Sequence, residues 1–182
     1  MPFTRKLVRD AMKAALANPA DGFNARIAAI ADEYGIEPFT IDFGAGSLSF
    51  LETYADQPGR LSSRLIAGVS LFLYTSLSEQ DSAKEKAKRA VFEGSVTAHL
   101  DFDVCFREGI GITEELTENY ADAIEHAVTD VLLDAAAPNT EALFSGPVYF
   151  SGGFACAREP AVQTADGFRQ LLPFTFLYEV HA

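Results

Sequence analysis

Three side chains that could do chemistry alternate along one short segment. The stretch GSVTAHLDFDVCF, from Gly94 to Phe106, places His99, Asp101 and Asp103 at every second position. In a β-strand this spacing puts all three side chains on one face, with alternate Cα atoms about 7 Å apart. Histidine and carboxylates together are suitable ligands for Zn²⁺ or Mn²⁺, so a metal-dependent hydrolase is one hypothesis.

The rest of the same segment favours a strand with one solvated face. From Phe92 to Phe106 the even positions are apolar or Gly, and the odd positions are mostly polar. A half-buried strand has this alternation whether or not it binds an ion. No HExxH or CxxC motif supplies a further ligand pair. We therefore predict a long strand with no metal, whose polar face meets water or another subunit.

Motifs for covalent catalysis and for phosphate binding are missing from the sequence. It has no GxSxG elbow, and the glycine-rich segments 44–46 and 109–111 lack the GxGxxG and P-loop patterns. Cys105 and Cys156 have no CxxC spacing, and we interpret them as reduced thiols. We predict no enzyme, no catalytic residues and no cofactor.

Composition predicts one globular domain over residues 1–182. Apolar residues make up 48% of the chain and charged residues 22%. A chain of this length can bury about two-thirds of its unfolded surface. The longest apolar runs are far shorter than the roughly 20 residues of a transmembrane helix, and the N-terminal segment lacks the apolar stretch of a signal peptide. We expect an intracellular protein with no membrane partner.

Negative charge is concentrated in the second half of the chain. The net charge is −12, and residues 1–100 carry 11 Lys or Arg against 12 Asp or Glu. Residues 101–182 carry 3 against 14. Such a surface repels phosphate, so sequence-specific nucleic-acid binding is not expected.

The first third of the chain predicts two helices and then two strands. Apolar residues at helical spacing predict helices over 4–17 and 21–34, the second capped by Asp21. Segments 39–43 and 47–54 read as strands joined by a glycine-rich hairpin turn.

Further strands and one long helix are predicted downstream. The strands are expected over 64–76, 92–106, 147–156 and 168–180, and the helix over 113–136 with Thr113 as its cap. The polar segment 76–89 is predicted to be a long loop. This order predicts an α+β fold, in which one antiparallel or mixed sheet of about five or six strands is packed by helices on one face.

Two of the predicted helices carry charge of a single sign. The first would expose Arg5, Arg9 and Lys13 at intervals of four residues, where like charges repel. The long helix has no Lys or Arg, and its acidic residues include Glu118, Asp122, Glu125, Asp130 and Asp134. These are either two solvated faces or two surfaces that meet across a subunit boundary. In the second case, Lys84, Lys86 and Lys88 of the loop are further candidates for the interface. A contact between two different surfaces of identical subunits is heterologous, and it forms a ring when the rotation from one subunit to the next closes.

The order of elements, the length, the acidic surface and the long polar loop resemble those of the tail-terminator and head–tail completion proteins of tailed bacteriophages. The segments FEGSVTAHLDF and LLPFTFLYEV belong to this resemblance, which covers residues 3–180. It implies a homo-oligomeric ring, often a hexamer, that caps the tail tube and connects it to the head. The implied partners are copies of this chain and the tail-tube and head-completion proteins, in the virion or in the host cytoplasm during assembly.

Two further hypotheses stand beside the tail-terminator assignment. The two N-terminal helices exceed the simplest form of the family, so a neighbouring neck or minor tail component is an open alternative. A third hypothesis, beside the ring and the hydrolase, is a small-molecule or peptide-binding module whose aromatic cleft is lined by the Phe-rich segment 168–180.

Overall fold

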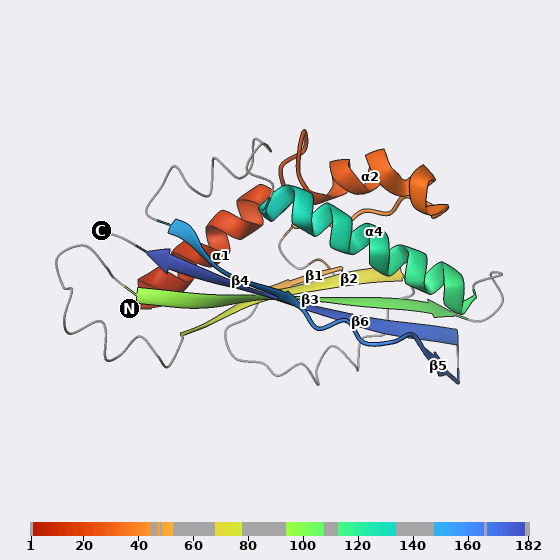
Figure 1. The fold of residues 1–182 in the computed structure, drawn as a ribbon. Coiled ribbons are helices and arrows are strands. Elements are labelled where there is room, and N and C mark those ends of the chain that lie inside the picture. The colour runs from red at the N-terminus through yellow and green to blue at the C-terminus, as the bar shows by residue number, and fades with distance from the viewer. Residues whose placement is uncertain are drawn as a thin grey trace.

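In the part of the chain that the computed structural model describes, three helices cover one face of a single β-sheet (Figure 1). The described residues are 2–44, 47, 49–52, 68–77, 94–107, 113–133, 148–165 and 167–180. The helices are α1 (Pro2–Leu16), α2 (Phe23–Tyr34) and α4 (Glu114–Leu132). One layer of helices on one layer of strands confirms the predicted α+β fold.

Two long strands form the middle of the sheet. The described strands are β1 (Phe50–Glu52), β2 (Gly68–Leu77), β3 (Gly94–Arg107), β4 (Val148–Cys156), β5 (Val162–Thr164) and β6 (Gly167–Val180). Their order is β1-β2-β3-β6-β4, with β5 also paired to β6. Only the β1–β2 pair among them is parallel. β3 and β6 are each 14 residues long and pair along their whole length.

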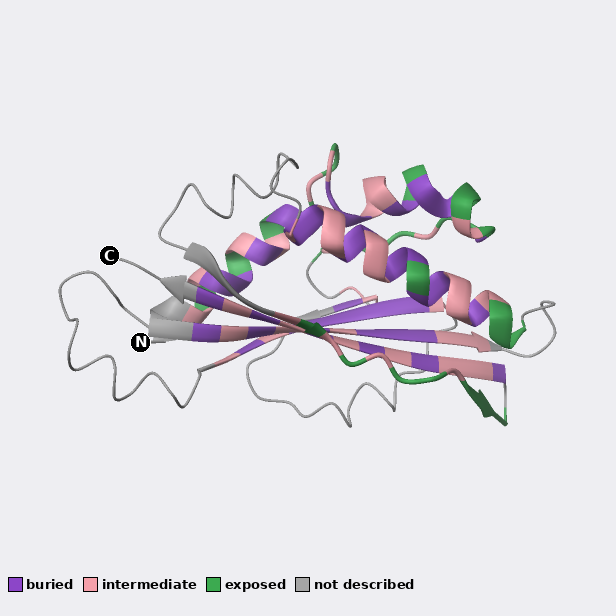
Figure 2. Ribbon diagram, viewed as in Figure 1, coloured by how far each residue is buried: buried purple, intermediate pink, exposed green. Residues whose placement is uncertain are grey.

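The alternation along β3 and β6 separates a buried face from a partly exposed one (Figure 2). The helix-facing side chains are completely buried, namely Val96, Ala98, Leu100, Phe102 and Val104 on β3 and Leu172, Phe174, Phe176 and Tyr178 on β6. The ring of Phe102 lies 5.1 Å from that of Phe23 on α2 and 5.8 Å from that of Phe174. The predicted apolar face is thereby confirmed.

Helix α2 begins at Phe23, later than predicted, because the backbone of Gly22 is bonded to the turn at Asn18 that precedes the helix. Its N-cap is Gly22, and the predicted cap, Asp21, is wrong. The Gly22 N–H donates to the Asn18 carbonyl at 2.8 Å, and a Cβ on Gly22 would lie 2.4 Å from that oxygen. The predicted cap of the long helix is correct, since the Thr113 hydroxyl accepts a bond from the Leu116 N–H at 3.1 Å.

The predicted hairpin before β2 is wrong. Residues 39–43 form no strand, and β1 pairs with β2 in parallel instead. The side-chain amide of Asn24 donates to the Ile41 carbonyl and accepts from the Ile41 N–H, both at 2.8 Å. These bonds satisfy the backbone groups that a neighbouring strand would otherwise satisfy.

Pro173 is tolerated inside β6 because of the chain that follows β4. The Pro173 carbonyl accepts a bond from the Ala157 N–H, and the Leu171 carbonyl accepts one from the Glu159 N–H. In an antiparallel strand the N–H and C=O of one residue point toward the same neighbour. The N–H that proline lacks would therefore face this connection, and the pairing with β3 is unaffected.

Truncation of Phe102 tests the core between α2 and the sheet. We expect Phe102→Ala to lower the free energy of unfolding by about 3–5 kcal/mol, because the ring leaves a cavity against Phe23 and Phe174. Urea denaturation measures the change. Val162→Ala is the control, since Val162 is 57% exposed and its truncation should cost less than about 0.5 kcal/mol. Equal losses in the two variants would contradict this packing.

Candidate functional site

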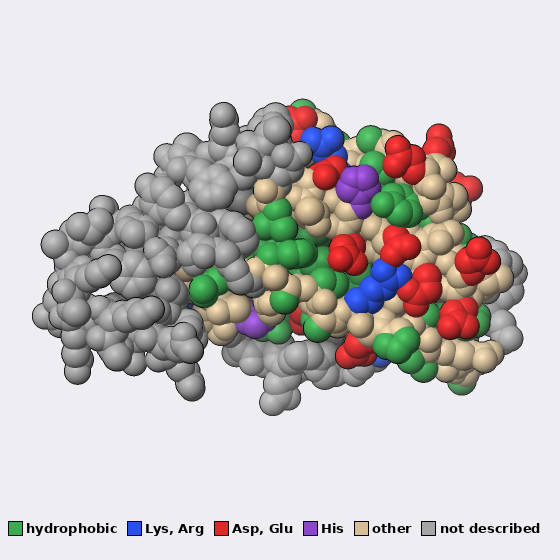
Figure 3. Space-filling view, viewed as in Figure 1, with side chains coloured by type: hydrophobic (Ala, Val, Ile, Leu, Met, Phe, Trp, Pro, Cys, Tyr) green, Lys and Arg blue, Asp and Glu red, His purple; other side chains and the backbone are tan. Residues whose placement is uncertain are grey.

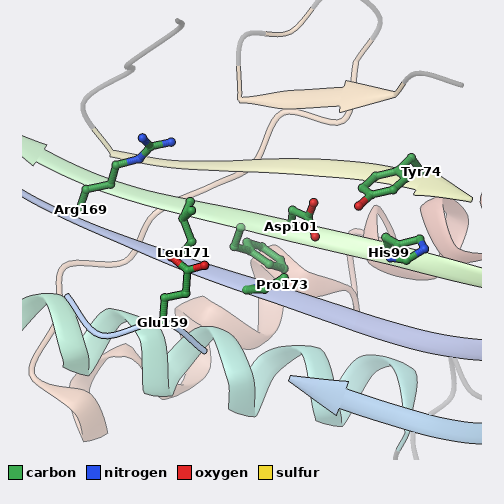
Figure 4. Close-up of a pocket in the computed structure, with 8 residues that line it drawn as sticks. Tyr74, His99, Asp101, Glu159, Arg169, Leu171 and Pro173 are labelled. Carbon is green, nitrogen blue, oxygen red and sulfur yellow. The ribbon is translucent and has the colours of Figure 1, made fainter. Parts of the chain in front are cut away.

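The face of the sheet opposite the helices carries the residues whose side chains could bind an ion or take part in a reaction. β3 presents His99, Asp101 and Asp103 there, as their spacing predicted. Tyr74 of β2 lies directly opposite His99 in the register. In Figure 4 the Tyr74 hydroxyl points toward Asp101.

His99 is held by two residues of β2. Its ring stacks on that of Tyr74, with 4.5 Å between centroids and 5° between planes. Its Nε2 lies 3.0 Å from the Ser76 hydroxyl. Partial burial lowers the pKa of His99 below its ordinary value near 6.5, so the imidazole is neutral at neutral pH.

Asp101 is the most strongly perturbed carboxyl among the residues described. Burial raises the pKa of Asp101 to about 6, and the hydrogen bond from Tyr74 opposes that rise. Burial, with the nearby Asp101 charge as a second cause, raises the pKa of Tyr74 to about 12. The Tyr74 hydroxyl therefore stays protonated at neutral pH and donates to the carboxylate.

Asp103 forms an ion pair with β6 and is not solvated. Arg169 Nε donates to Asp103 Oδ1 at 2.8 Å, and Nη2 donates to Oδ2 at 2.6 Å. Asp103 is only 4% exposed, so the prediction of a wet strand face is wrong at this position. The hydrogen bonds that Arg169 donates to Asp103 raise the pKa of Arg169, so the guanidinium stays charged at neutral pH.

The three candidate ligands therefore have three different sets of partners. His99 contacts Tyr74 and Ser76, Asp101 contacts Tyr74, and Asp103 pairs with Arg169 of another strand. Over the described ranges no group of three His, Cys, Asp or Glu side chains is arranged to hold a metal ion. The geometry gives the metal-dependent hydrolase no support.

Cys105 and Cys156 form no disulfide, in agreement with their interpretation as reduced thiols from the sequence. Burial raises the pKa of Cys156 to about 11, and the Glu125 carboxylate adds to that rise. A thiol of this kind stays protonated at neutral pH and is a poor nucleophile.

A cavity of about 270 Å³ lies on the same face of the sheet (Figure 4). Its lining residues are Tyr74, His99, Asp101, Phe102, Glu159, Arg169, Leu171 and Pro173. Three of the polar ones, Tyr74, Glu159 and Arg169, were not identified as site residues from the sequence. Arg169 is the only charged residue among the strictly alternating positions 168–178, and that isolated charge was the available signal.

The predicted aromatic cleft on segment 168–180 is wrong. Phe174, Phe176 and Tyr178 are completely buried under the helices, where they form part of the core. The cavity lies on the opposite face of β6, between Leu171, Pro173 and the neighbouring strands.

The acidic face of α4 is partly neutralised by a residue distant in sequence. Arg158, in the connection between β4 and β5, forms ion pairs with Glu118 and Asp122 and lies 3.9 Å from Glu125. Figure 3 shows basic side chains as a minority among the acidic ones on this face. Asp130 lies 3.4 Å from His126 Nε2, and the predicted interface residues Asp134, Lys84, Lys86 and Lys88 lie outside the described residues.

The predicted basic stripe on α1 is only partly exposed. Arg9 is 6% exposed, so the prediction of an exposed side chain is wrong there. Around a helix of about 100° per residue, Arg9 lies about 20° from Leu16, which is completely buried. Arg5 and Lys13 are half-buried, and the Lys13 ammonium lies 5.2 Å above the centre of the Phe50 ring.

Comparisons with known proteins give no family for this chain. A scan against models of protein families, a search of curated proteins and a search of solved structures found no match. None of the described helices is long and apolar enough to cross a membrane.

Asp101 should titrate near pH 6. Because its folded pKa lies above the ordinary value of 3.8, the stability contributed by the protonated carboxyl is complete below about pH 3.8 and is lost as the pH rises through 6. Asp101→Asn should therefore gain stability relative to the natural chain as the pH rises from 4 to 8. Urea unfolding across this range tests the sign, and NMR of the carboxyl carbon gives the midpoint. In Tyr74→Phe the midpoint should move upward, and a midpoint near 4 in the natural chain would contradict the burial of Asp101.

Removal of Arg158 should destabilise the contact between α4 and the β4–β5 connection. We expect Arg158→Gln to cost about 1–2 kcal/mol at neutral pH and low salt, since the ion pairs are partly exposed. Partial burial opposes ionisation of Glu118, but the bonds from Arg158, Gln170 and the Ala161 N–H outweigh it and lower its pKa.

The pH dependence of the Arg158 variant provides a second readout. The stability that Glu118 contributes is present above its ordinary pKa near 4.5 and is lost as the pH falls through the lower folded value. This acid-dependent loss should shrink in Arg158→Gln. Lys6→Gln is the control, because the exposed pair of Lys6 with Asp10 should contribute less than about 0.5 kcal/mol. If Arg158→Gln lost as much stability at acid pH as the natural chain does, the ion pair of Arg158 with Glu118 would not stabilise the fold.

Proposed function

We propose that the protein is a structural component of a tailed-phage virion, of the tail-terminator or head–tail joining type. In this proposal it forms a ring that caps the tail tube and connects it to the head. The acidic surface over α2 and α4 is the observation that carries the proposal (Figure 3). Exposed carboxylates there include Asp32, Glu33, Glu114, Glu115 and Asp122. A ring whose lumen carries such a surface would let DNA pass without binding it.

The fold is compatible with an assembly role. The protein has helices on one face of a largely antiparallel sheet, and the resemblance rests on an order of elements of this α+β kind. The polar residues on the other face of the sheet are engaged with one another, and this leaves no assembled catalytic group among those described. A structural function accounts for this arrangement without invoking a reaction.

The subunit contact that we propose joins α1 of one copy to α4 of the next. Glu118 and Asp122 form close ion pairs with Arg158 of their own chain. Glu125 lies 3.9 Å from that guanidinium, so its interaction with Arg158 is weaker. Lys13 on α1 is half-exposed. A contact of Lys13 with Glu125 of the next copy is heterologous and would close a ring, with the charges fixing its register.

Sedimentation velocity tests the ring directly. The monomer has a mass of 19.7 kDa, and the proposal predicts a particle several times heavier at low salt. The particle should dissociate as salt rises, because the Debye length falls from about 10 Å at 0.1 M to about 3 Å at 1 M. A monomer at high protein concentration and low salt would rule the ring out.

A charge swap tests the proposed contact. Glu125→Lys should weaken assembly, and adding Lys13→Glu in the same chain should restore it, because the pair is recreated with reversed signs. Asp32→Lys is the matched control, with the same change of charge outside the proposed contact. Weakening by Asp32→Lys to the same degree would indicate an effect of net charge and contradict the contact.

A further inference from the structure

Among the residues that the structure describes, those around the cavity on the outer face of the sheet carry more negative than positive charge. Asp101 and Glu159 line it, and so does Arg169, whose charge is compensated by the bidentate bond to Asp103. The described residues that line the cavity or pair with its lining thus supply three carboxylates and one guanidinium. At neutral pH His99 adds no positive charge, because burial lowers its pKa.

The size and shape of the cavity limit what it can hold. Its volume of about 270 Å³ equals that of about nine water molecules. It is smaller than the sites of drug-sized ligands, which start at about 300 Å³. Leu171 and Pro173 supply apolar surface on β6, and the stacked rings of Tyr74 and His99 stand at one end, with Arg169 at the other (Figure 4).

We propose that this cavity binds a guanidinium or ammonium group on a short apolar chain, such as an arginine or lysine side chain or a free amine of that size. The cationic group interacts with the carboxylates of Asp101 and Glu159, and the apolar chain lies against Leu171 and Pro173. An anion is disfavoured, because the guanidinium of Arg169 is already bonded on two of its nitrogens by Asp103. The proposal goes beyond ring assembly and does not depend on it.

Binding of a cation should depend on pH through Asp101. Within the described ranges, the titratable and charged groups that face the cavity or its ion pair are Tyr74, His99, Asp101, Asp103, Cys105, Glu159 and Arg169. Among them Asp101 changes its charge near pH 6, and a bound cation favours the ionised form. Affinity should therefore be about tenfold higher at pH 8 than at pH 5, where about one Asp101 in ten is ionised.

Titration of the full chain with n-butylguanidinium tests the proposal, with binding followed by NMR shifts of the β3 and β6 amides. Neutral n-butylurea and anionic valerate are the matched probes, and both should bind at least about tenfold more weakly. Asp101→Asn and Glu159→Gln should each weaken binding of the cation about tenfold, and Asp101→Asn should also reduce the pH dependence. Asp32→Asn, on α2, should bind as the natural chain does.

Several results would overturn the cation site. They are equal binding of n-butylurea, tighter binding of valerate, and unchanged affinity in a folded Asp101→Asn variant. A short blocked peptide with a central arginine separates the two sources of the cation. Preference for the peptide assigns a protein side chain, preference for free n-butylguanidinium assigns a small molecule, and binding of neither refutes the proposal. Ring formation is measured without these probes, so the two proposals can fail separately.

Discussion

The antiparallel pairing of β3 with β6 is the constraint on which the other features of the protein depend. It aligns Gly94 with Val180 at one end and Arg107 with Gly167 at the other, across 14 residues of each strand. Because side chains alternate between the two faces, this one register decides which residues enter the core and which line the outer face. A shift by one residue would place Asp103 under the helices and the Phe102 side chain on the outer face of the sheet.

The same register explains the chemistry of the outer face. Asp103 and Arg169 lie on adjacent strands within reach of a bidentate ion pair, and Asp101 lies opposite Pro173. Pro173 and Leu171 cannot solvate a carboxylate, and among the described residues the hydroxyl of Tyr74 is the side-chain donor to Asp101. The raised pKa of Asp101 is thus a consequence of strand alignment and burial.

Local patterns in the sequence predicted the elements and their faces well. The alternation over 92–106 identified β3 and its buried side, and Thr113 marked the start of α4. Errors arose where a distant group competed with the local signal. Asn24 supplies the backbone bonds of Ile41, which removes the expected strand over 39–43.

The site could not be predicted in the same way, because its partners are far apart in sequence. Arg169 reaches Asp103 across 66 positions, and Arg158 reaches Glu118 across 40. Periodicity shows which face a residue occupies, but it does not show which strand lies beside it. For this reason the sequence indicated water or another subunit beside the acidic side of α4, and it did not indicate Arg158 of the same chain.

Electron microscopy of the full chain mixed with phage tail tubes tests the central claim most directly, namely that the fold serves assembly. The account predicts rings with a central opening, seated at the tube ends and stopping their growth. Tubes that keep growing, with the protein unbound and monomeric beside them, would contradict it.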